Sequence, residues 1–479
     1  MSRVFKNIFW LSTSRGLALI FLFLAYAQLF RYLGPFGSGQ YQFVLSYVLI
    51  FSTVVDFGVQ QFMTKKMSED ESGTRKYFHN FLAFETVAAL LLYALLLAIA
   101  YFRGFEPVVF KAVAITGLGM VANALCYPFL SVMTARQDLK KVALINFLNS
   151  LVNISIIFLA IWLKKYILFL ASIQLIFGIL DLILYRIFIA KHLPKPRVLA
   201  VFENFDLSVI ANILKSAWPF ALLVGFSAIY NRIDVIIITK LLGFTQTGLY
   251  TAAYKFFDIL NFFPASVSHV LFPVLAGLMA KNLIFDVRQT LEKYLRLMLA
   301  VALPMAVGGM LLSGQLMTLV AGKDFSASAP VLSILIWAVA ILFVYIPVNS
   351  LVISQLTKKA MLVTGANVVL NILGNIILIP YYGIKGAAVM TVVSESIQGI
   401  FYFYFVRKNI TDFKFLSILW KPALAAFIMG LAVWSMKGVN LVTDFLVGAL
   451  VYLACLLLMK FITQEDRQFF WSLLRNGKS

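Results

Sequence analysis

A chain of 479 residues that is 62% hydrophobic and only 13% charged, with a mean hydropathy of +0.93, is not a soluble globule, because soluble domains are about 45–50% apolar and about 25% charged. Apolar runs of about 20 residues recur from end to end, each long enough to cross a bilayer as a helix, which excludes an outer-membrane barrel. The net charge of +20 is spread over many short loops, which argues for membrane topology and against nucleic-acid binding. The predicted fold class is an all-α polytopic membrane protein.

The first apolar run resembles a secretory signal. Arg3 and Lys6 precede an apolar stretch, and residues 25–27 (AYA) have the small side chains of a cleavage site. However, Arg15 interrupts the run, and the segment is matched by an internal helix near residues 216–240 that no signal peptidase would meet. We therefore expect the segment to be retained as the first membrane helix.

Hydropathy read in windows of about 19 residues predicts about fourteen spans. They lie near 8–30, 41–64, 81–102, 112–134, 142–162, 167–189, 216–239, 250–280, 295–320, 330–356, 361–380, 386–406, 418–436 and 442–462. With the N-terminus inside, this count places most of the 40 Lys and Arg residues in inner segments, as the positive-inside rule requires. Both termini are therefore expected on the cytoplasmic side of a multi-pass protein of a bacterial or archaeal cytoplasmic membrane.

One short stretch occurs twice in the chain. Residues 31–41 (RYLGPFGSGQY) return as residues 240–250 (KLLGFTQTGLY), at a constant offset of 209 that aligns two glycines and the final tyrosine. Glycines permit a tight reversal of the backbone, and tyrosines favour the membrane–water interface. Each stretch is interpreted as the turn of a helical hairpin, with Tyr41 and Tyr250 at the interface.

A second match, at an offset of 218, supports a duplication of the whole first half. Residues 127–153 and 345–371 share a tyrosine, a Lys-Lys pair and two asparagines at the same spacing. Six spans in each half enter the membrane with the same orientation, which predicts two six-helix lobes related by a pseudo-twofold axis along the membrane normal.

The predicted organisation has four parts. Residues 1–190 form an N-terminal six-helix lobe, 191–215 a cytoplasmic linker, 216–408 a C-terminal six-helix lobe, and 409–479 two additional membrane helices with a cytoplasmic tail. The linker begins with KHLPKPR, whose prolines prevent the continuation of a helix. Its later part, 202–214, mixes apolar and acidic residues and is expected to form an interfacial helix.

The motifs of enzymes and metal proteins are missing from the sequence. It contains no Walker A motif, no glycine-rich dinucleotide turn, no HExxH motif and no Cys/His metal spacing. Cys126 and Cys455 both fall inside apolar runs, which gives no support to a disulfide framework. We expect no catalytic residues, no metal and no cofactor, and hence a transporter rather than an enzyme.

The candidate functional residues are ionisable side chains within the predicted spans, because such groups usually line a water-filled cavity or pair with one another. Arg15, Arg232 and Lys255 are interpreted as cations of a central cavity that bind an anionic substrate, and the alternative is that they form ion pairs that fix helix register. The full set is Arg15, Asp56, Glu85, Asp181, Arg232, Asp234, Lys255, Asp258, His269 and Glu395.

Spacing along the helices limits which of these residues can meet. Lys255 and Asp258 are three residues apart and can satisfy each other on one helix face, whereas Arg232 and Asp234 point to nearly opposite faces and need partners on other helices. The candidates for ion coupling, or for ion pairs within the cavity, are Asp56, Asp234, Asp258 and Glu395. For Asp56, pairing with a neighbouring arginine is favoured over proton coupling.

Two stripes of asparagine add neutral polar groups to the spans. They occupy positions 146, 149 and 153, and positions 367, 371 and 375. Their spacing of three or four residues is typical of interhelical hydrogen bonds, and it also fits the polar wall of a cavity.

Taken together, these stretches resemble the polysaccharide-export branch of the multidrug/oligosaccharidyl-lipid/polysaccharide exporter superfamily, the Wzx-type O-antigen flippases. The resemblance is carried by NRIDVIIITKLLGFTQTGLYTAAYKFFD at 231–258, FPASVSHVLFPVLAGLM at 263–279, IPYYGIKGAAVMTVVSES at 379–396, YLGPFGSGQY at 32–41 and DFGVQQFMTKK at 56–66. It covers nearly the whole chain, and its motifs mark the branch well and the substrate poorly.

The resemblance implies two lobes around a cationic cavity that works by alternating access. The implied cargo is an oligosaccharide on a polyprenyl diphosphate, such as an O-antigen unit of lipopolysaccharide, moved from the cytoplasmic to the outer leaflet of the cell inner membrane. Arg15, Arg232 and Lys255 match the family's cavity cations on spans one, seven and eight, whereas span two carries Asp56 in place of a cation. The implied partners are this cargo, membrane lipid and polysaccharide polymerase or assembly proteins, with no nucleic acid, and we expect a monomer.

Three alternatives remain open: a lipid II flippase, a multidrug or cation antiporter of the same superfamily, and a membrane polysaccharide polymerase or glycosyltransferase. A drug antiporter needs a more acidic cavity than the arginines of spans one and seven indicate. A polymerase or glycosyltransferase would be expected to carry a large outer loop with catalytic motifs, and every predicted outer loop is short.

Overall fold

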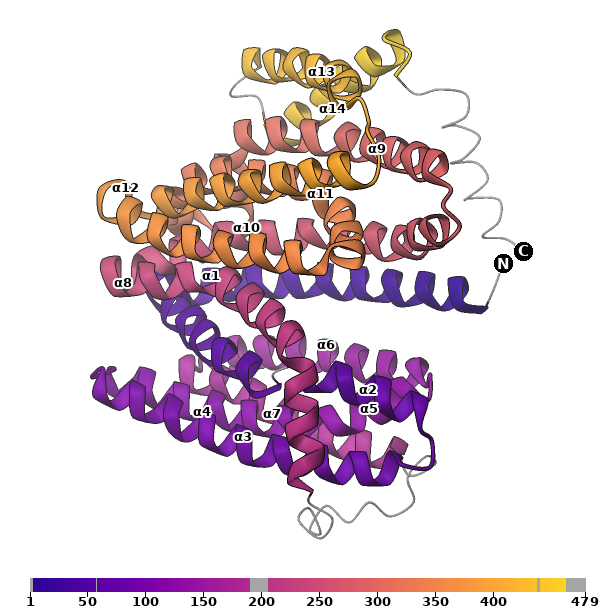
Figure 1. Ribbon diagram of the computed structural model, residues 1–479. Helices are drawn as coiled ribbons and strands as arrows, with labels where there is room; N and C mark the ends of the chain where they lie inside the picture. The colour runs from indigo at the N-terminus through magenta and orange to yellow at the C-terminus, as the bar shows by residue number, and fades with distance from the viewer. Residues whose placement is uncertain (1–2, 57, 190–205, 437–439, 462–479) are drawn as a thin grey trace. The chain divides into compact units, whose positions relative to one another are not determined.

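The computed structural model describes residues 3–56, 58–189, 206–436 and 440–461, and these residues contain no β-strand. The helices are α1 (Arg3–Asp56), α2 (Val59–Glu69), α3 (Thr74–Phe102), α4 (Pro107–Ala124), α5 (Tyr127–Ala135), α6 (Leu139–Trp162), α7 (Ile167–Ile189), α8 (Leu207–Ala280), α9 (Ile284–Leu311), α10 (Ser313–Ala321), a 3-10 helix η2 (Lys323–Ser328), α11 (Ala329–Gln355), α12 (Thr357–Asn409), α13 (Phe415–Ser435) and α14 (Leu441–Leu458) (Figure 1). The chain is therefore an all-α polytopic membrane protein.

Within the described residues, 11 helical stretches are long and apolar enough to cross a membrane. Three of the helices, α1, α8 and α12, have 54, 74 and 53 residues, and each is interrupted by one glycine with non-helical backbone angles. A helix rises about 1.5 Å per residue, so each of the three is long enough for two passes. Two passes for each would be consistent with the predicted fourteen spans, and that number stays a prediction.

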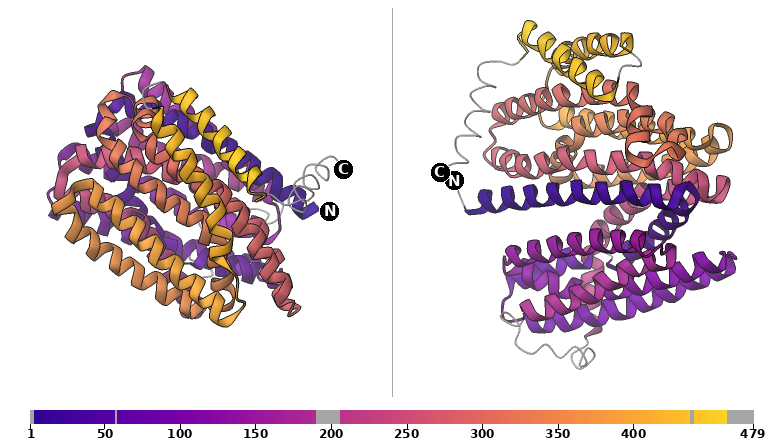
Figure 2. Two further views of the ribbon diagram at one scale, coloured as in Figure 1. Left: turned by 90° about the horizontal axis from the view of Figure 1, so that it is seen from above. Right: turned by 180° about the vertical axis from the view of Figure 1, so that it is seen from behind.

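The bends occur where the repeated stretch predicts turns. Gly34 has φ 65° and Gly243 has φ 82°, which is backbone that a glycine adopts without strain and that most residues avoid. The offset of 209 relates these two positions, so the two halves bend at the same place. Figure 2 shows α1, in indigo, as two arms that meet at a sharp bend. The third bend, at Gly383 (φ 57°), separates the spans predicted at 361–380 and 386–406.

The chain separates into two units that do not follow the sequence order. Unit 1 comprises Met1–Thr251 and Thr364–Ile384, and unit 2 comprises Ala252–Val363 and Lys385–Ser479. Both α8 and α12 contribute segments to each unit. The lobe boundaries read from the sequence stay a prediction.

Unit 1 is held together by close helix contacts and by two buried apolar clusters. Gly119 on α4 lies against the backbone of Gln174 on α7, and Gly178 on α7 lies against Ala122 on α4. Small residues let membrane helices approach at backbone distance, which increases van der Waals contact where lipid removes the hydrophobic driving force. One cluster joins α1, α3, α4, α6 and α7, and the other joins α2, α3, α5, α6 and α7.

In unit 2, the two C-terminal helices α13 and α14 pack against each other and against α9, as Figure 1 shows at the yellow end of the chain. Their buried residues include Ala425, Met429 and Tyr452. The small side chain of Ala425 and the flexible one of Met429 fill the space between these helices.

The interfacial helix expected at 202–214 is not separate in its described part. Residues 202–205 lie outside the described residues, and from Leu207 the chain runs as helix α8 as far as the bend at Gly243. Residues 207–214 are therefore the first turns of α8. The segment contains neither proline nor glycine, so nothing in it stops the helix.

The start of α8 is attached to α3 by polar contacts. The backbone N–H of Asp206 donates to Oδ1 of Asn80 at 2.7 Å, and Lys76 Nζ lies 3.2 Å from the Asp206 carboxylate. The hydroxyl of Ser208 donates to the same carboxylate at 2.5 Å. The Ser208 hydroxyl, and after it Lys76, lowers the pKa of Asp206 to about 2.

The charge of Asp206 should therefore support this attachment until the solution is strongly acidic. A carboxyl whose pKa is lower in the folded state stabilises the fold above its unfolded pKa of about 3.9, and this contribution is lost as the pH falls toward the folded value. We expect the 13C-carboxyl shift of Asp206, assigned with Asp206→Asn, to titrate near its depressed value. In Ser208→Ala the midpoint should move up toward that of an ordinary aspartate, and an unchanged midpoint would contradict this account.

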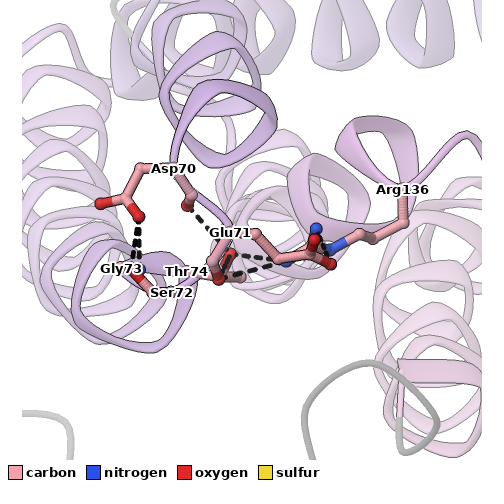
Figure 3. Close-up of polar contacts among 6 residues, drawn as sticks. All are labelled: Asp70, Glu71, Ser72, Gly73, Thr74 and Arg136. Carbon is pink, nitrogen blue, oxygen red and sulfur yellow. Dashed lines mark hydrogen bonds and ion pairs between the residues drawn. The ribbon is translucent and has the colours of Figure 1, made fainter.

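The loop between α2 and α3 is fastened to the end of α5 by Arg136 (Figure 3). The guanidinium donates to Oγ1 of Thr74 at 2.9 Å and to the carbonyl oxygen of Glu71 at 3.3 Å, and it forms an ion pair with the Glu71 carboxylate. Within the loop, Asp70 Oδ1 accepts from the Ser72 hydroxyl at 2.7 Å. The loop is thus connected to α5 by hydrogen bonds as well as by charge.

Arg136→Ala should lower the stability of unit 1, whereas Glu71→Ala should change it little. The Arg136 side chain is 17% exposed and the Glu71 side chain is 81% exposed. An exposed ion pair contributes about 0–1 kcal/mol, and hydrogen bonds from a charged donor contribute about 1.5–3 kcal/mol. Thermal unfolding in detergent measures both variants, and equal losses would assign the effect to the ion pair instead.

Candidate functional site

The two equivalent bends of the duplicated chain lie against each other within unit 1. A Cβ added to Gly39 would come within 1.8 Å of the carbonyl oxygen of Phe244, and one added to Gly248 within 1.9 Å of the carbonyl oxygen of Pro35. No side chain fits between these backbones. The second arm of each bend therefore crosses the other bend in direct backbone contact, and only glycine allows it.

Aromatic rings surround this crossing. The ring of Phe244 meets Phe36 edge-on and Phe43 in a similar geometry, with ring centroids 5.8 Å apart in each pair. Such T-shaped contacts are worth about 0.5–1.5 kcal/mol each beyond their buried area. The crossing is thus a well-packed element, built from one bend of each half.

Asp234 lies on the first arm of α8, near this crossing in sequence. Its side chain is 4% exposed, and its carboxylate accepts a hydrogen bond from the Tyr250 hydroxyl and one of 2.8 Å from the backbone N–H of Val235. Tyr250 is the last residue of the repeated stretch. Tyr250 lies on the second arm of the same bend, which the hydropathy analysis counted as the next span. This partner of Asp234 is therefore on the neighbouring predicted span, within the same helix α8.

The repeated tyrosines do not lie at the water interface as predicted. Tyr41 is 2% exposed and Tyr250 is 0% exposed. Each phenol reaches back to the first arm of its own bend, Tyr41 to a hydrogen bond with Tyr26 and Tyr250 to Asp234. The sharp bend brings the two arms together, so each phenol has a hydrogen-bond partner inside the protein. This partner takes the place of the water molecule that an interfacial tyrosine would contact.

The three predicted cavity cations are described to different extents. Arg232 is half-buried on α8 in unit 1. Lys255 belongs to unit 2 and forms an ion pair with Asp258, with Nζ and Oδ2 3.4 Å apart, as their spacing indicated. The side chains of Arg15 and of His269 lie outside the described residues. A cavity lined by Arg15, Arg232 and Lys255 stays a prediction.

Asp56 has a different partner from the expected arginine. Its Oδ1 accepts the backbone N–H of Gln60 at 2.9 Å, and the N–H of Gly58 also points to it. Gly58 (φ 70°) precedes the first residue of α2 and separates this helix from α1. The N–H groups in the first turn of a helix have no acceptor within the helix, so they are available to the Asp56 carboxylate. Among the described residues, Asp56 therefore binds a helix start and no basic side chain.

Glu395 in unit 2 has a partner that the sequence analysis missed. It is 3% exposed and accepts a hydrogen bond from the Tyr345 hydroxyl. The signal for Tyr345 was present in the second repeat, where it is the match of Tyr127. The match alone did not identify the acid that the hydroxyl would meet, because equivalent positions in a sequence do not show which side chains lie close together.

One of the two asparagine stripes makes the predicted interhelical hydrogen bond, and the other makes a bond within its own helix. Asn149 on α6 donates to Asp181 on α7 at 2.9 Å, which is an interhelical bond. On α12, Asn375 donates to Asn371 at 3.0 Å along the same helix. Both contacts satisfy polar groups that lipid cannot solvate.

Hydrogen bonds from tyrosine hydroxyls, an asparagine amide and backbone N–H groups hold the carboxylates of Asp56, Asp181, Asp234 and Glu395. The described residues contain no group of three or more His, Cys, Asp and Glu side chains that could hold a metal ion. Buried carboxylates held by tyrosine hydroxyls or by amides, on helices that bend at glycine, are typical of a protein whose polar interior contacts a solute or an ion.

Comparison with known proteins adds a family, two relatives and a fold. Residues 4–279 match the family described as "Polysaccharide biosynthesis protein". The chain is 26% identical over 224 residues to the probable low-salt glycan biosynthesis flippase Agl15 of Haloferax volcanii, covering 46% of this chain and 47% of that protein. It is 25% identical over 175 residues to the probable flippase AglR of the same organism, covering 36% and 37%. The matched part thus spans half or less of the length of these curated relatives.

Two solved structures share the fold. The lipid II flippase MurJ, in an inward closed conformation, matches with a TM-score of 0.77 at 18% identity, over 93% of this chain and 98% of that one. An inward-facing multidrug transporter of the MATE family matches with a TM-score of 0.60 at 14% identity, over 82% and 94%. At these identities the likeness establishes the architecture of the helices.

Proposed function

Because the chain belongs to the polysaccharide biosynthesis protein family, we propose that it is a flippase that moves a lipid-linked oligosaccharide across the cytoplasmic membrane. The cargo is an oligosaccharide on a polyprenyl diphosphate, a building unit of O-antigen or a related surface polysaccharide, carried from the cytoplasmic to the outer leaflet by alternating access. The observation that carries the proposal is the family match over residues 4–279, supported by a MurJ-like fold over 93% of the chain. The protein is a transporter in this proposal and acts without a cofactor.

The head group explains why cations would be retained inside a membrane. A diphosphate brings negative charge and strong acceptor oxygens into the spans, and an arginine can bind it through paired, charge-assisted hydrogen bonds. We assign this role to Arg15, Arg232 and Lys255. Both termini lie in the cytoplasm, and the protein acts as a monomer beside the polysaccharide polymerase and assembly proteins.

In this proposal the membrane potential or a cation gradient drives transport by acting on the acidic residues of the spans. One elementary charge that crosses 100 mV exchanges about 2.3 kcal/mol. The groups that carry this coupling, or that form ion pairs within the cavity, are Asp56, Asp234, Asp258 and Glu395.

The test is leaflet transfer of a fluorescent polyprenyl-diphosphate oligosaccharide in proteoliposomes, at matched amounts of folded protein. Arg15→Ala and Arg232→Ala should each slow transfer about tenfold or more, because a charge-assisted contact is worth about 1.5–3 kcal/mol. Arg103→Ala is the matched control, since Arg103 is exposed at the end of α3. Unchanged transfer in both variants would make these arginines structural, and no transfer by the wild type would refute the flippase itself.

Lipid II is the second candidate cargo, favoured by the likeness to MurJ. It carries the same diphosphate and lipid, and it differs in its sugar and peptide. The same assay with lipid II in place of the oligosaccharide separates the two cargoes. An organic cation tested in a third arm separates both from drug export.

A further inference from the structure

Glu85 is an unusual buried acid in unit 1. It lies on α3, its side chain is 0% exposed, and neither of its carboxylate oxygens has a hydrogen-bond partner among the described residues. The other buried acids described above each accept at least one hydrogen bond. A carboxylate without donors in an apolar environment is very unfavourable, because nothing replaces the water that solvated its charge.

A second acid lies near Glu85. Val59, three residues after Asp56, and Leu82, three residues before Glu85, belong to the same buried cluster. Asp56 at the end of α1 therefore lies close enough to act on Glu85 electrostatically, and Tyr127 at the start of α5 is within reach of both charges. Glu85 is fully buried and Asp56 is half-buried. Two carboxylates close together repel each other, and the one that is harder to ionise then holds a proton.

Among the described residues, no charged side chain on α1, α2, α4 or α5 forms an ion pair with Glu85 or Asp56. On α1, Arg31 is exposed, and the side chains of Arg3, Lys6 and Arg15 lie outside the described residues. At the start of α5, Tyr127 and the preceding residue Cys126 are titratable and bring no positive charge. On α2, the two lysines form ion pairs with Glu69 at the surface. On α4, the one charged residue, Lys111, is exposed.

The local hydrogen bonds decide which acid carries the proton. Asp56 accepts N–H groups from Gly58 and Gln60 at the start of α2, where the helix dipole also favours a negative charge. Glu85 has no such donors. The geometry points to Glu85 and Asp56 as a one-proton site, in which Glu85 holds the proton and Asp56 holds the negative charge.

The position of the proton in this site depends on the backbone conformation between α1 and α2. Asp56 keeps its donors only while the first turn of α2 remains in place beyond Gly58. If that turn moves away, Asp56 loses the groups that favour its charge and competes with Glu85 for the proton. This inference concerns unit 1 alone and holds whatever the cargo is.

Infrared difference spectroscopy of the full-length protein at neutral pH tests the assignment. Wild type minus Glu85→Gln should show the C=O stretch of a protonated carboxyl, because the substitution removes one neutral acid. Bands of an ionised carboxylate in this difference would overturn the proposal. Asp181→Asn is the control, since Asp181 lies on α7 and accepts a hydrogen bond from Asn149, and it should leave the Glu85 band in place.

Asp56→Asn provides a second test that does not require Glu85→Gln to fold. Removing the neighbouring negative charge makes ionisation of Glu85 easier, so the protonated-carboxyl band should disappear at a lower pH than in the wild type. A band that titrates at the same pH in both proteins would show that Asp56 does not share the site. Thermal unfolding of each variant confirms that folded proteins are compared.

Discussion

Gly248→Ala, and likewise Gly39→Ala, should force the two bends of unit 1 apart. The added Cβ would lie 1.9 Å or 1.8 Å from a carbonyl oxygen of the opposite bend, where real contacts are above about 3 Å, and no side-chain rotation relieves a clash with backbone. Overpacking commonly costs about 1–3 kcal/mol and sometimes more, and we expect the upper part of this range at each position. Gly225→Ala is the matched control, because a Cβ there has no neighbour within 4 Å.

The separation of the bends can be measured directly. Phe36 and Phe244 meet across the crossing with ring centroids 5.8 Å apart, so cysteines placed at these two positions should react with one short bifunctional thiol reagent, after Cys126 and Cys455 are replaced. Cross-linking should be high in the Gly225→Ala background and strongly reduced in the Gly248→Ala background. Equal yields in the two backgrounds would show that the contact tolerates a side chain.

Gly178→Ala should greatly reduce the amount of folded protein, because it separates α4 from α7. The new Cβ would lie 2.4 Å from the Cβ of Ala122 and 3.1 Å from its carbonyl carbon. Gly119→Ala, which places a Cβ 2.5 Å from the backbone of Gln174, should behave in the same way. Membrane helices that associate through small residues lose contact along the whole interface when they are pushed apart.

A rescue experiment separates this steric cause from general intolerance to mutation. Ala122→Gly removes the atom nearest to the new Cβ, so the double variant with Gly178→Ala should recover part of the folded fraction measured by size-exclusion chromatography. Gly314→Ala on α10, where a Cβ has no neighbour within 4 Å, is the control. The steric account fails if the double variant is no better folded than Gly178→Ala alone.

The bends were readable from the sequence, and the contact between them was not. Positions 34 and 243 are both glycine, and glycine adopts positive φ without strain. This is a local property of the residue, so a bend can be predicted at each position from the sequence. An offset of 209 shows that two stretches are equivalent, and equivalence says nothing about distance. The approach of Gly39 to Phe244 depends on how whole helices pack, so it became visible only in three dimensions.

The same limit applies to the charged residues. The pairing of Lys255 with Asp258 follows from their spacing on one helix. The tyrosine that binds Asp234, the helix start that binds Asp56 and the missing donors around Glu85 all depend on neighbours brought by other segments. Hydropathy predicted where these acids lie along the spans, and it contains no information about what faces them.

Unit 1 contains a segment, Thr364–Ile384, that the ribosome makes long after Thr251. Synthesis at about 5–20 residues per second leaves an interval on the order of ten seconds before that segment enters the bilayer. During this time the first seven predicted spans, which belong to unit 1, are in place without one of the helices that complete their unit. The contacts that this segment makes within unit 1 can therefore form only after more than three-quarters of the chain has been translated.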